Sequence, residues 1–86
     1  MKPTAEEIEA KVRTAIADVL ESPIDGPAEA DLEADSLDKI EIAMNLESAF
    51  GFEEYSIDDE KSEGRKSVAD WCEVVSDLLD ARRVRA

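Results

Sequence analysis

The chain has no histidine and a single cysteine, Cys72, among its 86 residues. Without histidine, the Ser-His and Cys-His pairs that activate many nucleophiles cannot form, and imidazole ligands for a metal are excluded. One cysteine cannot form an intramolecular disulfide. We expect Cys72 to pack in the core, because a free cysteine behaves as a small hydrophobic side chain. The chain is therefore predicted not to be an enzyme.

Aromatic residues and long apolar runs are also scarce. Only 5% of the residues are aromatic, against a hydrophobic fraction of 43%, so the core must be mostly aliphatic. An aliphatic core suits a small helical bundle better than a sheet, whose strands favour β-branched and aromatic residues. No apolar run is long enough to span a membrane, and no signal peptide is recognised. We expect a single domain over residues 1–86, monomeric, cytoplasmic and without stable membrane insertion.

Basic residues are few, and the net charge is −13 at pH 7. Between Thr14 and Glu60 there are 15 acidic residues against one base, Lys39. Such a field repels nucleic acids and anionic membranes and attracts proteins that carry basic patches. The chain ends differently, in the basic sequence ARRVRA, whose arginines are favourable near a helix C-terminus. The expected partners are basic proteins and not nucleic acids.

The first helix is predicted from a capping box and from its apolar spacing. Thr4 and Glu7 form the box, and apolar residues then recur three and four positions apart. A proline, Pro23, ends the helix. The next stretch is rich in proline, glycine and acids, which predicts a loop over residues 22–35. Its two apolar members are its expected anchors to the core: Ile24 and Leu32.

Two further helices and one short element complete the predicted fold. The second helix runs from about residue 36 to residue 50 and is stopped by Gly51. A short element follows Ser56, which looks like another cap, and residues 58–66 form a polar connector. The last helix starts at Ser67, with an acid three residues later, and carries one apolar face. The prediction is all-α: a small four-helix bundle of three main helices and one short helix.

The second helix has two apolar faces. At 100° per residue, one arc collects the predicted core face: Ile42, Ala43, Leu46, Ala49 and Phe50. A separate arc, roughly opposite, holds three more apolar residues: Leu37, Ile40 and Met44. Glu41 and Glu47 flank this second arc, and Ser36 projects onto its edge. Either the helix is central and buried on both faces, or the second arc is an exposed docking strip for a basic, partly apolar partner.

Ser36 stands where this helix is predicted to begin, directly after Asp35. A hydrolase nucleophile would need a histidine base and an oxyanion glycine motif, and the chain has neither. Free backbone N–H groups favour an anion at a helix N-terminus, but Asp35 and Asp38 oppose free phosphate here. The pattern instead indicates covalent modification by another enzyme, which would use the two acids as handles.

Residues 31–42 resemble a calcium-binding loop only superficially. Ser36 occupies the sixth position, where a glycine is needed, and Ile42 the twelfth, where a bidentate glutamate is needed. We therefore predict no metal site.

The stretch DLEADSLDKIEIAMNLESAF, residues 31–50, resembles the segment of acyl carrier proteins around their modified serine. It has the Asp-Ser-Leu triplet, followed by an acidic amphipathic helix that closes with phenylalanine. The resemblance covers nearly the whole chain through helix number, spacing and the final helix SVADWCEVVSDLL. The triplet alone is a frequent tripeptide, whereas triplet, helix pattern, length and acidity together make a specific match.

The resemblance implies that Ser36 carries a 4′-phosphopantetheine arm, transferred from coenzyme A by a phosphopantetheinyl transferase. The thiol of the arm would hold acyl groups as thioesters and present them to acyl-transferring or acyl-elongating enzymes of fatty acid, lipid or polyketide biosynthesis. Three residues would contact the transferase: Asp35, Leu37 and Asp38. Four would contact the basic docking patches of other partners: Ile40, Glu41, Met44 and Glu47.

The sequence departs from the family pattern in places. Glu33 stands where the family commonly has glycine, and Asp58 where a proline often follows the isoleucine. The loop before Ser36 is shorter than usual and the segment over residues 50–67 is longer. These differences favour a specialised carrier at least as much as a general one. Two alternatives stay open: a peptidyl or aminoacyl carrier, and an acidic adaptor in which Ser36 is only a helix cap.

Overall fold

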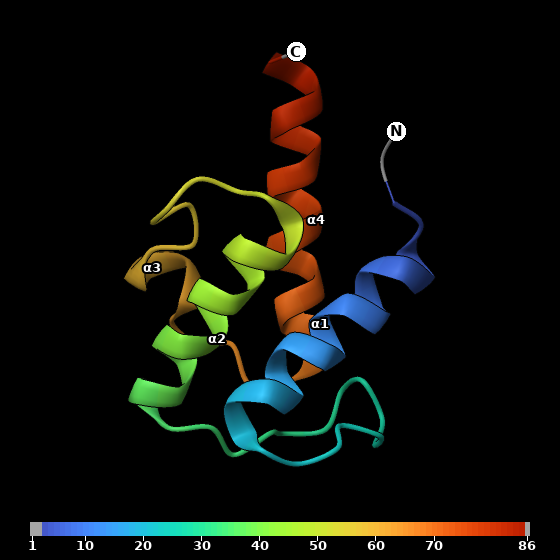
Figure 1. Cartoon of the computed structure of the whole chain (residues 1–86), viewed down its shortest axis with the longest axis vertical. Coiled ribbons are helices and arrows are strands. Elements are labelled where there is room, and N and C mark those ends of the chain that lie inside the picture. Colours follow the sequence, from blue (N-terminus) through green and yellow to red (C-terminus); the bar gives the residue numbers. More distant parts are fainter. Residues whose placement is uncertain (1–2, 86) are drawn as a thin grey trace.

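The computed structural model describes residues 3–85, with side chains described through residue 81. All regular secondary structure in this part of the chain is helical: α1 (Ala5–Leu20), α2 (Ser36–Phe50), α3 (Asp59–Ser62) and α4 (Val68–Arg85) (Figure 1). The predicted bundle of three main helices and one short helix is confirmed. The arginine side chains of the basic ending, at positions 82, 83 and 85, lie outside the described side chains. None of the described helices is both long and apolar enough to cross a membrane.

Two of the main helices begin at the capping pairs that the sequence predicts. At α1, the Thr4 hydroxyl accepts a hydrogen bond from the Glu7 N–H at 3.1 Å, and the Glu7 carboxylate accepts one from the Thr4 N–H at 2.8 Å. At α4, Ser67 and Asp70 exchange the same two bonds at 3.1 and 3.2 Å. Each pair satisfies N–H groups that the helix itself cannot satisfy.

The ends of α1 and α2 are both formed by residues with left-handed backbone. Gly51, with a φ of 71°, ends α2 as predicted. Pro23 does not end α1, because the helix stops at Leu20 and Glu21 turns the chain with a φ of 55°. The N–H of Glu21 reaches back to the Ala17 carbonyl, so the helix is already closed before the proline.

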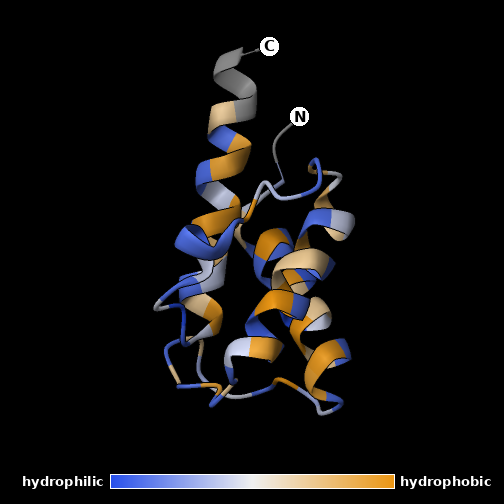
Figure 2. Cartoon of the chain, turned by 90° about the vertical axis from the view of Figure 1, so that its left-hand side faces the viewer, coloured by the Kyte–Doolittle hydropathy of each residue, from blue (hydrophilic) through white to orange (hydrophobic). Residues whose placement is uncertain are grey.

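The core lies between α1 and the two helices that pack on it, α2 and α4. It is aliphatic, as predicted, and surrounds one fully buried indole, that of Trp71. Polar and apolar residues are interspersed along α1, α2 and α4, whereas the four residues of α3 are all polar (Figure 2). The buried hydrophobic residues are Ile8, Val12, Ala15, Ile16, Ile42, Ala43, Leu46, Ile57, Val68, Trp71, Val74, Val75 and Leu79.

Two predicted core residues are placed differently by the structure. Ala49 is exposed and lines an open groove between α1 and α2, beside Lys11 and Asp18. Cys72 is half-buried rather than fully buried. Burial still raises the pKa of its thiol, and the negative charge of Glu9 raises it further. The thiol of Cys72 is therefore a poor nucleophile.

The loop between α1 and α2 is fastened to the helices at several points. The Arg13 side chain donates to the carbonyls of Ile24 and Gly26, at 2.8 and 2.9 Å. The N–H of Leu32 donates to the Lys66 carbonyl at 2.7 Å. Ile24 and Leu32 both pack against the core, which confirms them as anchors. The loop thereby fixes where α2 begins relative to α1 and α4.

The short helix α3 lies within the segment predicted as polar connector. Its N-cap is Asp58, whose carboxylate accepts a hydrogen bond from the Lys61 N–H at 2.9 Å. The prediction of a cap at Ser56 is wrong. Ser56 instead closes a turn, because its N–H and its hydroxyl both donate to the Glu53 carbonyl, at 3.2 and 2.6 Å. Four helical residues are too few to produce an apolar period in the sequence.

Candidate functional site

Ser36 is the first residue of α2, and its side chain is exposed. The N-cap is Asp35, whose carboxylate accepts a hydrogen bond from the Asp38 N–H at 2.8 Å. The Asp38 carboxylate accepts a weaker bond from the Asp35 N–H, at 3.3 Å. Within residues 3–85, the Ser36 hydroxyl has no hydrogen-bond partner. The interpretation of Ser36 as a helix cap is therefore wrong, and the start of the helix does not depend on its hydroxyl.

A hollow of about 360 Å³ opens beside Ser36, between the start of α2 and the α3 segment. Lys39, one turn after Ser36, lines the same hollow. Lys39 is the only base between Arg13 and Lys61 in the sequence, and it forms no ion pair with any residue that the structure describes. The far wall comes from α3 and the residues after it, including Ser62 and Gly64. A group attached to Ser36 would therefore find space there, lined by one base, Lys39, and by two acids, Asp59 and Glu63.

The outer face of α2 carries an exposed apolar strip, made of Leu37, Ile40 and Met44. The exposed fractions of these three side chains are 64%, 46% and 59%. Figure 1 shows α2 between α1 and α3, but α3 has a single turn and cannot cover the outer face of α2. The prediction that the second arc is exposed is confirmed, and burial on both faces is excluded. Glu41 is exposed beside the strip.

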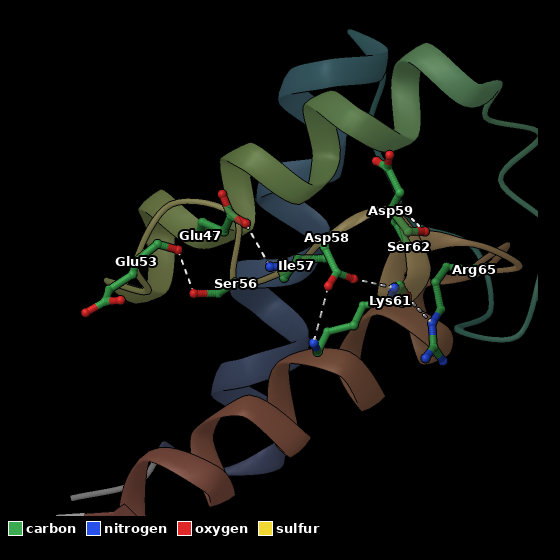
Figure 3. Close-up of polar contacts among 9 residues, drawn as sticks. All are labelled: Glu47, Glu53, Ser56, Ile57, Asp58, Asp59, Lys61, Ser62 and Arg65. Atoms are coloured by element: carbon green, nitrogen blue, oxygen red, sulfur yellow. Dashed lines mark hydrogen bonds and ion pairs between the residues drawn. The ribbon is translucent and has the colours of Figure 1, made fainter.

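The sequence predicts that Glu47 flanks the apolar strip at the surface, and this prediction is wrong. Its side chain is buried, and its carboxylate accepts a hydrogen bond from the Ile57 N–H at 2.8 Å (Figure 3). Ile57 is also buried, so water does not replace this partner. Glu47 is buried because the loop after α2 folds back over the second half of the helix. Glu47 joins that loop to α2 and is not available as a rim charge.

A second hollow, of about 240 Å³, lies between α2 and α3 next to the apolar strip. Its apolar walls are Ile40, Ala43, Met44, Tyr55 and Ile57. Tyr55 is 79% exposed, and its backbone is left-handed, with a φ of 66°. Nothing in the sequence points to this residue, because neither its conformation nor its neighbours on α2 are encoded locally.

No protein-family model matches this chain, and no solved structure matches it.

Proposed function

We propose that this chain is an acyl carrier protein, in which Ser36 is covalently modified with 4′-phosphopantetheine. The single observation that carries the proposal is the exposed Ser36 hydroxyl, which has no structural role in capping α2. It stands within an Asp-Ser-Leu triplet, at the start of a helix whose outer face is apolar and acidic. Because the Ser36 hydroxyl is not needed for the cap of α2, it can serve as an attachment point.

The residues around Ser36 fit such a modification. The hydroxyl is exposed, so its substitution breaks no hydrogen bond of the described chain. The hollow beside it gives room for a flexible chain. Lys39 is the one base in its lining, and the acids Asp59 and Glu63 would keep the negative charge of a phosphodiester toward Lys39 and the solvent. Asp35 and Asp38 are held by the cap, each through one carboxylate oxygen, and their other oxygens can contact a transferase.

The chain would supply the nucleophile and the docking surface of the transfer reaction. The Ser36 oxygen would form a bond to the phosphorus that carries the pantetheine, the pyrophosphate bond of coenzyme A would break, and adenosine 3′,5′-bisphosphate would leave. The hydroxyl proton would pass to a base of the transferase, because the chain has no histidine of its own. The attached group would supply the thiol that holds acyl groups as thioesters. The protein would be a cytoplasmic monomer that presents these acyl groups to enzymes of fatty acid, lipid or polyketide biosynthesis.

The apolar strip would be the docking surface for these enzymes. Leu37, Ile40 and Met44 offer apolar contact area, and the methionine side chain adapts to different partners. Glu41 is exposed beside them and would meet basic side chains. Glu47 is left out of this surface, because its carboxylate is committed to the Ile57 N–H.

The test is the intact mass of the protein after incubation with coenzyme A and a broad-specificity phosphopantetheinyl transferase. We expect one added phosphopantetheine on the natural protein and none on Ser36→Ala. A known carrier, treated in parallel, shows that the transferase is active. A folded protein that stays unmodified with several transferases of different specificity would contradict the proposal and favour an unmodified acidic adaptor.

A further inference from the structure

Tyr55 has an unfavourable backbone conformation, and its exposed side chain makes little packing contact to offset the energetic cost. It is the third residue of a turn closed by the Ser56 N–H and the Glu53 carbonyl, at 3.2 Å. Its φ of 66° is one that glycine or asparagine adopts at low cost and that a bulky residue rarely adopts. The ring is 79% exposed, so packing inside the protein gives little in return. Folding alone does not explain a tyrosine here, and such exceptions concentrate at functional sites.

The ring of Tyr55 forms one wall of the hollow between α2 and α3, together with Ile40 and Met44 of the apolar strip. The hollow measures about 240 Å³. For comparison, an apolar cavity of about 150 Å³ holds one benzene molecule. The hollow therefore has room for one large apolar side chain, and Tyr55 extends the exposed apolar surface from α2 onto the loop.

Carboxylates line this hollow or stand next in sequence to residues that line it. Asp59 lines it, and Figure 3 shows its carboxylate pointing toward α2. Asp58 lines it too, but holds Lys61 at 3.8 Å. Glu41 is exposed next to the strip, and Glu54 precedes Tyr55 in the chain. Of these four acids only Asp58 pairs with a base within the described residues, so this acidic region attracts the lysines and arginines of another protein.

We infer that Tyr55 is a specificity-determining residue of the docking surface. The occupant of the hollow is a partner helix that places one large apolar side chain between α2 and α3, with basic side chains on either side of it. The apolar side chain contacts Tyr55, Ile40 and Met44, and the basic side chains contact Glu41, Glu54 and Asp59. This inference deepens the proposed function, because it names the partner chemistry of the same surface.

The probe is a short helical peptide with one central phenylalanine flanked by lysines and arginines, and without tyrosine or tryptophan. Tyr55 is the only tyrosine of the chain, so labelling with 3-fluorotyrosine gives a single ¹⁹F signal that reports on this site. We expect the peptide to shift this signal. Titration calorimetry should then show that Tyr55→Gly weakens binding at least about fivefold, the loss typical of a residue that matters at an interface.

Two controls separate docking from stability and from charge. Tyr55→Phe keeps the ring and should bind within about twofold of the natural protein, since the apolar wall is retained. Tyr55→Gly should melt at the same or a higher temperature, because glycine accepts the left-handed backbone. A peptide with alanine in place of its central phenylalanine should bind more weakly than the original, which contact through charge alone would not produce.

Several outcomes would overturn the inference. These are no peptide binding, equal binding by Tyr55→Gly, and equal binding by the alanine peptide. A ¹⁹F signal that responds to an acyl group on Ser36 but not to the peptide would assign the hollow to the cargo. A signal that responds to protein concentration alone would assign it to a second copy of the chain.

The mass test of Ser36 is independent of Tyr55. An unmodified Ser36 together with weakened peptide binding by Tyr55→Gly would remove the carrier proposal and leave this surface. A modified Ser36 with no effect at Tyr55 would remove this inference alone.

Discussion

The Asp35 carboxylate lies 2.8 Å from the Asp38 backbone nitrogen, and this hydrogen bond, rather than one from Ser36, caps α2. We expect Asp35→Ala to lower the free energy of unfolding by about 1 kcal/mol, the usual cost of a lost N-cap. Ser36→Ala should change it by less than about 0.5 kcal/mol. Urea denaturation of the two variants measures both values. Equal losses would contradict the assignment of the cap to Asp35.

Replacement of Glu47 should destabilise the protein, because this glutamate is buried and accepts a hydrogen bond there. Glu47→Ala leaves the buried Ile57 N–H without an acceptor, which costs about 1–3 kcal/mol of unfolding free energy. Glu47→Gln keeps an acceptor oxygen and should lose less. Glu41→Ala is the matched control, because Glu41 is an exposed acid of the same helix. Equal stability of the Glu47→Ala and Glu41→Ala variants would show that the bond to Ile57 contributes nothing.

Glu33 is a position where glycine should stabilise the protein. Its φ is 57°, a left-handed conformation that costs about 1–2 kcal/mol in residues other than glycine. Glycine gives back part of this gain through its larger loss of backbone entropy on folding. We therefore expect Glu33→Gly to raise the free energy of unfolding by up to about 1 kcal/mol.

The control for this change is Glu29→Gly, because Glu29 is exposed and its φ is not positive. Both substitutions remove one negative charge, so the difference between them isolates the backbone effect. Glu29→Gly should not stabilise the protein beyond the effect of the lost charge. Thermal denaturation that ranks the two variants in the opposite order would contradict the role of φ at Glu33.

Acid should weaken the start of α4 through Asp70. Its carboxylate accepts hydrogen bonds from the N–H groups of Lys66 and Ser67, at 2.8 and 3.1 Å. The bond from Lys66 is the main reason why the pKa of Asp70 lies below its ordinary value of 3.8. A lowered pKa in the folded state gives stability that is present above the unfolded pKa and is lost as the pH falls through the folded pKa.

The stability difference between the natural protein and Asp70→Asn should therefore be constant between about pH 7 and pH 5 and shrink below about pH 4. Denaturation curves of both proteins across this range give the difference directly, and other acids cancel in the comparison. A difference that stays constant down to about pH 2 would mean that the charge of Asp70 does not stabilise the cap.

The features that the sequence predicts well are those that neighbouring residues decide. The capping pairs of α1 and α4 lie three positions apart, and the glycine that ends α2 acts where it stands. The exposure of Leu37, Ile40 and Met44 can also be predicted from the sequence, because helical geometry separates these residues from the core face.

The features that the sequence does not reveal depend on contacts between distant segments. Glu47 is buried only because the loop brings the Ile57 N–H to it, ten residues away. The Arg13 side chain donates hydrogen bonds to two carbonyls of the loop between α1 and α2, and no sequence pattern in that loop predicts this contact. The hollow beside Tyr55 requires α3, whose single turn is too short for an apolar pattern. The location of Ser36 at the start of α2 is thus predictable, whereas the wall that α3 and its loop add to the hollow beside the apolar strip is not.

The helix α3 packs mainly on α2, whereas α1 packs on both α2 and α4. The local stability of the bundle should therefore be lower at α3 than at α1 and α4, because a single turn with few partners unfolds more easily than a long helix in the core. The amide hydrogens of Ser62 and Glu63 should exchange with solvent long before those of Val12 and Val75. The width of the hollow between α2 and α3 would then fluctuate while the rest of the bundle stays intact.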